Sequence, residues 1–153
     1  MLRCLIASAA LLAMAGPAAS QIVGNTLQAA MDVRGTACTP TGQCQTLPAP
    51  ISAINIYFSP NGNAYVYGSG RRGLELPIGR FVGASGGQQG VFVAGNRVDF
   101  KFANAEAMLG ISFRVSGSRC TASGLASSAT ALRVTFAVTR QQYCRIVRGR
   151  VER

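Results

Sequence analysis

Apolar and polar side chains alternate with a period of two along much of this chain. Residues 27–34 show the pattern first, with apolar side chains at Leu27, Ala29, Met31 and Val33. Polar side chains lie between them at Gln28, Asp32 and Arg34. This alternation is typical of a β-strand that turns one face to a core and the other to solvent. The pattern therefore predicts a strand here.

The clearest hairpin is predicted within residues 54–67. Ile54, Ile56 and Phe58 alternate with their neighbours, and residues 64–67 form a second extended run. The turn between them contains the pair Asn61-Gly62. An Asn-Gly pair between two such runs is a strong signal for a tight turn, so we expect two antiparallel strands.

The same alternation predicts further strands, at residues 78–82, 91–94, 98–102, 109–115 and 132–138. Gln141 and Gln142 are expected to turn the chain into a last strand at residues 143–151. Three segments are expected to be irregular because they are rich in glycine, proline or small polar residues. They are residues 35–50, residues 116–130, and residues 83–90, the last as a flexible hairpin connection.

Eight to nine short strands joined mostly by short turns predict an all-β fold, an antiparallel meander barrel or a sandwich. We favour the barrel because closure leaves no exposed strand edge. The chain contains no repeat and no shift of composition that would mark a second domain. Residues 21–153 are thus expected to form a single domain large enough to bury a core.

Residues 1–20 have the features of an export signal. Arg3 supplies the positive charge, and residues 5–15 form an apolar run too short to span a bilayer. Small side chains follow, so we expect cleavage before Gln21 and a periplasmic or secreted product. No later segment has the apolar length of a membrane-spanning helix, so no transmembrane segment is expected after the signal is removed.

Cysteine positions fit this interpretation. Cys4 leaves with the signal, and the four that remain are Cys38, Cys44, Cys120 and Cys144. An even number of cysteines in an exported protein predicts disulfides. Of the three possible connectivities, proximity favours Cys38–Cys44 and Cys120–Cys144, the second contributing about 3 kcal/mol. A zinc site is disfavoured because five residues between Cys38 and Cys44 are many for a metal knuckle.

The charge is strongly basic. The formal net charge is +10, and it becomes about +9 without the signal's Arg3. Every basic residue except Lys101 is arginine, whose guanidinium pairs with carboxylate, sulfate and phosphate. We therefore expect an anionic glycan, an anionic lipid surface or an acidic protein as partner, although high charge also keeps an exported protein soluble. Export argues against nucleic acid.

Candidate anion-binding residues are Arg71, Arg72, Arg140, Arg145, Arg148 and Arg150. Four tyrosines could interleave with these arginines, as aromatic side chains do on nucleic-acid platforms. They are Tyr57, Tyr65, Tyr67 and Tyr143.

Catalytic chemistry is poorly supported. The chain has no histidine, which excludes a serine or cysteine nucleophile activated by histidine and removes the commonest zinc ligand. Among the five acids, Asp99 is expected on a solvated strand face or in a cross-strand pair, and Glu75, which lies between two leucines, is the one whose neighbours hint at a perturbed environment. The glycine-rich residues 83–90 lack the Lys-Ser/Thr ending of a phosphate loop. No catalytic residue, cofactor site or metal site is assigned.

Four short segments carry a family resemblance: GNTL at residues 24–27, INIYFSPNG at 54–62, GNRV at 95–98 and YCRIVRG at 143–149. With them the chain resembles a group of small exported β-proteins of Gram-negative bacteria to which no activity is assigned. The resemblance implies an all-β fold and a periplasmic or secreted setting. It offers no catalytic residue.

Together these observations predict an exported, non-catalytic binding or structural module of the bacterial envelope or exterior. Two alternatives remain. One is a carrier in which the inward Phe58, Phe100, Phe113 and Phe136 line a cavity for a small apolar ligand instead of filling it. The other is an inhibitor of a periplasmic or host hydrolase, with residues 36–46 entering the enzyme's cleft. The oligomeric state is left open.

Overall fold

The computed structural model describes residues 22–47, 53–68, 73–80, 90–103, 108–128 and 133–152. Within these ranges almost every residue outside the turns belongs to a strand, which confirms the all-β prediction. The strands are β1 (Asn25–Cys38), β2 (Cys44–Leu47), β3 (Ala53–Phe58), β4 (Asn63–Gly68), β5 (Leu74–Arg80), β6 (Gly90–Ala94), β7 (Arg97–Ala103), β8 (Met108–Ser116), β9 (Arg119–Ser128) and β10 (Arg133–Arg148). The predicted export signal and the candidates Arg71 and Arg72 lie outside the described residues.

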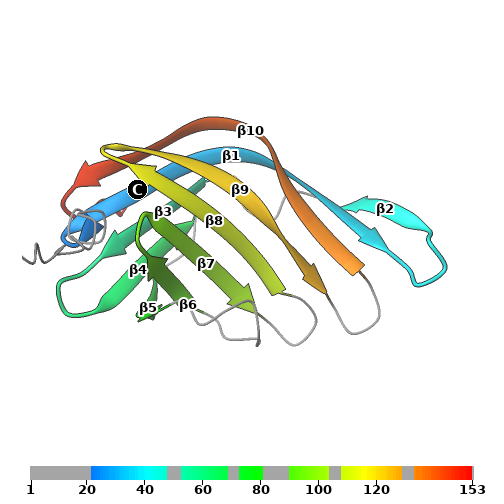
Figure 1. The fold of residues 1–153 in the computed structure, drawn as a ribbon, viewed down its shortest axis with the longest axis horizontal. Coiled ribbons are helices and arrows are strands. Elements are labelled where there is room, and N and C mark those ends of the chain that lie inside the picture. The colour runs from blue at the N-terminus through cyan, green and yellow to red at the C-terminus, as the bar shows by residue number, and fades with distance from the viewer. Residues whose placement is uncertain are drawn as a thin grey trace, which may run out of the picture.

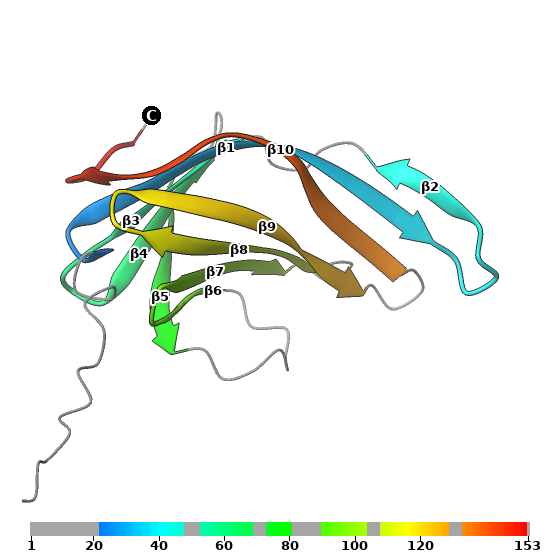
Figure 2. The same ribbon diagram turned by 45° about the horizontal axis from the view of Figure 1, so that its top comes forward.

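Nine of these strands close into a barrel, as predicted. Each strand from β3 to β9 pairs with the next in sequence, β1 pairs with β3, and pairing of β10 with β1 completes the ring. The tenth strand, β2, pairs with β1 outside the ring. Figures 1 and 2 show the resulting β1–β2 hairpin projecting from the barrel at the end away from the C-terminus.

One pair departs from the predicted antiparallel meander, because β5 and β6 run parallel. Ile78 lies opposite Val91, and Arg80 lies opposite Val93. A tight hairpin joins only antiparallel strands, and a parallel neighbour needs a crossover. The prediction of a hairpin connection at residues 83–90 is therefore wrong, although residues 81–89 themselves lie outside the described ranges.

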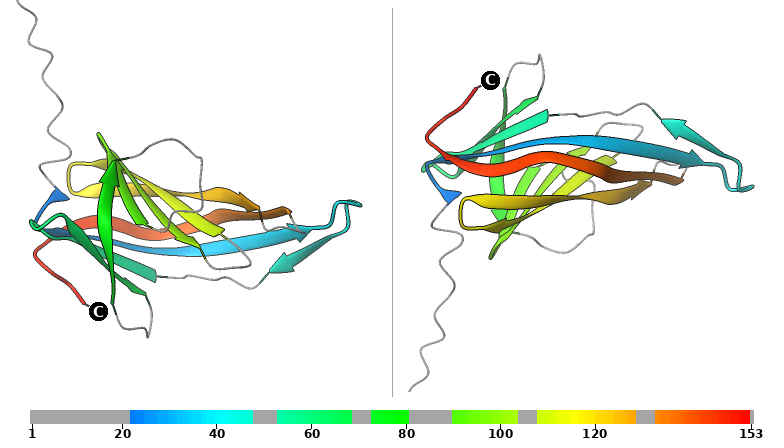
Figure 3. Two further views of the ribbon diagram at one scale, coloured as in Figure 1. Left: turned by 90° about the horizontal axis from the view of Figure 1, so that it is seen from below. Right: turned by 90° about the horizontal axis from the view of Figure 1, so that it is seen from above.

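The turn predicted at Gln141 and Gln142 is also wrong, since β10 is one continuous strand. It runs beside β1 for the whole length of both strands (Figure 3). The pairing shifts register twice, which leaves Thr139 and Gln142 as extra residues on β10. Such β-bulges bend a strand without ending it. The polar residues that resembled a turn are thus the bend of a long strand.

Residues 116–130, predicted to be irregular, contain β9. Serine, alanine and glycine have low strand propensity, but β9 has a strand on each side to pair with. Gly124 is required there, because a Cβ at this position would meet the carbonyl oxygen of Phe136 on β10. The Gln141 side chain also accepts a hydrogen bond from the Ala122 N–H at 2.7 Å and donates one to the Cys120 carbonyl at 3.2 Å. Pairing with its neighbours therefore overrides the local preference of the segment.

Alternation correctly predicted which side chains form the core. On β1, Leu27, Ala29 and Met31 are completely buried. The inward phenylalanines Phe58, Phe100 and Phe113 are between 0% and 3% exposed, and Phe136 packs against the same cluster. This packing is what a filled barrel requires.

Candidate functional site

The four cysteines form the two disulfides that proximity favoured, Cys38–Cys44 and Cys120–Cys144. Cys120 on β9 and Cys144 on β10 are 5% and 7% exposed and belong to the core cluster. Cys38 and Cys44 lie directly opposite each other on β1 and β2, and Cys44 is exposed. One bond therefore lies in the barrel wall and the other at the tip of the projecting hairpin.

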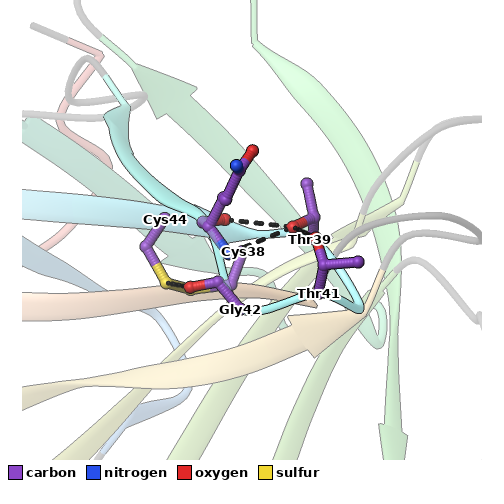
Figure 4. The surroundings of a disulfide bond; sticks show 6 residues. Cys38, Thr39, Thr41, Gly42 and Cys44 are labelled. Carbon is purple, nitrogen blue, oxygen red and sulfur yellow. Dashed lines mark hydrogen bonds between the residues drawn. A yellow bond between two sulfur atoms is a disulfide. The ribbon is translucent and has the colours of Figure 1, made fainter.

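The tip of the β1–β2 hairpin is organised by its own hydrogen bonds (Figure 4). The Thr39 N–H donates to the Gln43 carbonyl at 2.9 Å, and the Gly42 N–H donates to the Thr39 carbonyl at 3.0 Å. The Thr39 hydroxyl accepts from the Gln43 N–H at 3.1 Å and lies 2.8 Å from the Thr41 hydroxyl. The tip is thus a polar, uncharged loop whose ends are joined by a disulfide. A loop held in one shape in this way loses little conformational freedom when it binds a partner.

Exposed arginines gather on the outer face of β8, β9 and β10. Arg119 on β9 lies directly opposite Arg145 on β10, and both are exposed. Arg114 on β8 lies opposite Thr121, one diagonal step from Arg119 on the same face. Diagonal neighbours on a sheet are about 7–8 Å apart, within reach of long side chains. We call Arg114, Arg119 and Arg145 the arginine strip.

The charge of the arginine strip is not compensated by the described acids. Within the described part of the chain, ion pairs form at Arg97–Asp99 and Arg150–Glu152 and at no residue of the strip. Like charges placed directly opposite on neighbouring strands are destabilising. The pair Arg119–Arg145 therefore costs the fold some stability, and an anion lying over both guanidinium groups would remove that cost.

A buried polar network lies beside the strip on β7 and β8. Asp99 is only 1% exposed, so of the two predicted placements the solvated strand face is wrong, and the cross-strand pair is the one that forms, with Ser112 on β8. Its carboxylate accepts hydrogen bonds from the Ser112 hydroxyl at 2.5 Å and from Arg97 Nε at 2.9 Å. Because a buried carboxylate needs such partners, the network accounts for the position of Asp99. It also holds Arg97 directly opposite Arg114 of the strip.

The other predicted anion-binding residues do not all come together. Arg140 is exposed opposite Asp32, and Arg148 is exposed opposite Asn25 at the end of β10. Arg145 is the one predicted candidate in the arginine strip, where its Nε donates to Gln28 at 3.2 Å. Arg150 lies beyond β10 and turns toward tyrosines.

Arg150 is held by an aromatic hydroxyl and a carboxylate. Its Nε donates to the Tyr67 hydroxyl at 2.9 Å and lies 3.0 Å from Glu152. The hydrogen bond to Tyr67 is the main reason that the pKa of the Arg150 guanidinium is raised above its ordinary value. The guanidinium therefore stays charged, and its hydrogen bond and ion pair are made with Tyr67 and Glu152 of the same chain.

Arg114 and Arg119 were missed as candidates. Arg119 fell in a segment predicted to be irregular, so no face could be assigned to it. Arg114 stood alone as an outward residue on a predicted strand. Only the register of β8, β9 and β10 brings the two together, and register depends on neighbours distant in sequence.

Glu75, which lies between two leucines in the sequence, is exposed. Its carboxylate accepts hydrogen bonds from Asn63 Nδ2 at 2.6 Å and from the Tyr65 hydroxyl at 3.0 Å. Across the described ranges, no three metal-binding side chains of the His, Cys, Asp or Glu type cluster together. No helix among the described residues is long and apolar enough to cross a bilayer.

No family model matches the chain, and neither a curated protein nor a solved structure does.

Proposed function

We propose that the protein is an exported, non-catalytic binding or structural module of the bacterial envelope or exterior that holds an anionic partner on its arginine strip. The observation that carries the proposal is the exposed pair Arg119–Arg145, with Arg114 beside it and no described acid in contact. Arginines carried by neighbouring strands present several guanidinium N–H donors on one face of the sheet. Such an array suits repeated sulfate, carboxylate or phosphate groups.

Two further observations support the setting. Both disulfides are compatible with an oxidising compartment, which is where an exported protein resides. The net charge, +10 for the whole sequence and about +9 without the signal, would also draw the protein toward acidic surfaces before any specific contact forms.

A charge-reversal experiment tests the strip. Binding of wild type to a sulfated polysaccharide and to vesicles of anionic phospholipid is measured from about 0.1 M to about 1 M salt, over which the Debye length falls from about 10 Å to about 3 Å. We expect steep weakening with salt. The double variant Arg119→Glu/Arg145→Glu should lose at least about tenfold in affinity, since each basic residue near an anionic surface contributes about 1 kcal/mol.

The matched control is Arg34→Glu/Arg133→Glu. It makes the same change in net charge at two exposed arginines outside the strip. One lies in the second half of β1 and the other at the start of β10. Equal losses in both double variants would mean that only total charge matters, and binding that ignores salt would contradict the proposal. Comparison of the two probes distinguishes a glycan from a lipid surface.

A second candidate function is supported by the hairpin tip. Its projection and disulfide favour the inhibitor alternative, in which the loop enters a hydrolase's cleft. Inhibition of a panel of periplasmic and secreted hydrolases would be compared between wild type and Cys38→Ala/Cys44→Ala. Inhibition that survives loss of the disulfide unchanged, or that is absent throughout, would count against this candidate.

A further inference from the structure

Three tyrosine rings surround one guanidinium on the outer face of β3 and β4. Tyr57 on β3 lies directly opposite Tyr65 on β4, and their ring centroids are 6.3 Å apart. Tyr67 follows on the same face of β4. The Arg150 Cζ lies 4.6 Å from the centroid of Tyr65, 5.7 Å from that of Tyr67 and 5.9 Å from that of Tyr57. We call Tyr57, Tyr65 and Tyr67 the tyrosine cage.

The cage has the chemistry of a cation site. A cation within about 6 Å of an aromatic centroid is attracted by the ring's quadrupole, and here three rings act on one group. The Tyr67 hydroxyl oxygen accepts hydrogen bonds from both Nε and Nη2 of Arg150. At the edge, the Tyr65 hydroxyl donates to Glu75 at 3.0 Å, which adds a negative charge. A planar cation with two N–H groups on one edge therefore fits better than an ammonium without N–H groups.

The group that fills the cage belongs to the segment that follows β10, residues 149–152, which we call the tail. After β10 ends at Arg148, Gly149 turns the chain with a φ of +79°. The Gly149 N–H donates to the Gly24 carbonyl at 3.1 Å, and the Val151 N–H donates to the Thr26 hydroxyl at 3.1 Å. Both hydrogen bonds join the tail to the barrel. Thr26 donates in turn to the Gly149 carbonyl at 2.6 Å.

We expect the tail to be displaceable because its charged side chains are open to solvent. The Arg150 side chain is 45% exposed and its ion-pair partner Glu152 is 60% exposed, so solvent reaches both. Segments held by partly exposed hydrogen bonds can open locally without unfolding of the core. The three tyrosines of the cage are carried by β3 and β4 of the barrel wall and not by the tail.

We propose that the tyrosine cage is a binding site for an arginine side chain of a partner polypeptide, and that Arg150 occupies this site in the free protein. The site is separate from the arginine strip, since β1 lies between β10, which carries Arg145, and β3, which carries Tyr57. Arg150 competes as a tethered ligand with an effective concentration in the millimolar range. A partner must therefore present its arginine with additional contacts, or the tail must be released first.

Tyrosine fluorescence provides a direct test. The chain has no tryptophan and four tyrosines, and three of the four form the cage. N-acetyl-arginine amide would be titrated into wild type and into Arg150→Ala. We expect saturable binding to the variant in the millimolar range and at least about twofold weaker binding to wild type, because a tethered competitor whose effective concentration equals the dissociation constant of the probe halves the apparent affinity. N-acetyl-lysine amide and tetramethylammonium should bind the variant more weakly, since neither presents the planar fork.

The matched control is Arg145→Ala, because Arg145 lies over a single ring, that of Tyr143, at 5.2 Å. This variant should gain no binding, and Arg150→Ala/Tyr65→Leu should lose the gain. A thermal melt provides a second readout, since the arginine probe should raise the melting temperature of Arg150→Ala and leave that of Arg145→Ala unchanged. Absence of saturable binding to Arg150→Ala, or equal gains in both single variants, would overturn the proposal.

If Arg150→Ala proves unfolded, Glu152→Ala gives the same comparison, because it removes only the ion pair of the tail. This variant should bind the probe more tightly than wild type, and equal binding would overturn the proposal.

Discussion

The barrel wall and the projecting β1–β2 hairpin each carry one disulfide, in opposite surroundings. Cys120 and Cys144 are buried in the core and lie 24 residues apart in sequence. Cys38, which is half-buried, and Cys44, which is exposed, join two strand ends only 6 residues apart. The first bond connects distant parts of the chain, so its main effect is on global stability. The second closes a short loop, so its main effect is on the shape of that loop.

The difference follows from where each region obtains its stability. The wall is stabilised by burial of the inward side chains of nine strands. The hairpin tip contributes no side chain to the core cluster and depends on its hydrogen bonds, its disulfide and the pairing of β1 with β2. Changes in the wall should therefore lower the free energy of unfolding, whereas changes at the tip should alter local order.

The largest effect is expected from Cys120→Ala/Cys144→Ala. Loss of a 24-residue cross-link should lower the free energy of unfolding by about 3.5 kcal/mol from chain entropy. Denaturant unfolding of the oxidised wild type and the variant measures this. A loss below that of the hairpin disulfide variant would contradict the comparison.

Gly124→Ala should be the next most damaging change. The added Cβ would lie 2.8 Å from the carbonyl carbon of Phe136 and 3.0 Å from the Cα of Ala137, and backbone atoms cannot rotate away. We expect a loss of about 3 kcal/mol because β9 and β10 must move apart. Ser123→Ala, at the exposed neighbouring position, is the control and should change the melting temperature little.

Cys38→Ala/Cys44→Ala should cost less, about 2 kcal/mol, because the closed loop is short. Selective reduction provides an independent check. Under mild thiol treatment of the native protein, peptide mapping should find Cys38 and Cys44 labelled first, since Cys44 is exposed and both cysteines of the wall are buried. Equal labelling of the two pairs would mean that burial does not protect the wall.

The smallest effect is expected from Gly42→Ala at the tip. Gly42 has a φ of +86°, and no heavy atom lies within 4 Å of the position that a Cβ would occupy. Only backbone strain of about 1 kcal/mol should result. Hydrogen exchange should show faster exchange of the Gln43 amide and no change in the core strands. Destabilisation as large as that from Gly124→Ala would show that the tip is coupled to the barrel.

Alternation predicted β1, β3, β4, β7 and β8 because each has one face in the core, and burial imposes the same period on the sequence. It failed at β9, whose small residues have little strand preference and whose stability comes from the pairing on both sides. It also failed at Gln141 and Gln142, because a bulge and a turn use similar residues. The candidate tyrosines were named correctly as neighbours of arginine. The sequence could not show which arginine contacts them, since Arg150 lies 83 residues from Tyr67 in sequence.

The amino-acid order alone determined the strand-rich character, the inward residues and the basic charge, because each depends on composition or on near neighbours. The cysteine pairing followed from short separations. Closure of β10 on β1, the parallel pair β5–β6, the arginine strip and the tyrosine cage were decided by the tertiary structure. These features depend on strand register and contacts between distant segments, which are selected by the packing of the whole barrel and not by any local stretch of chain.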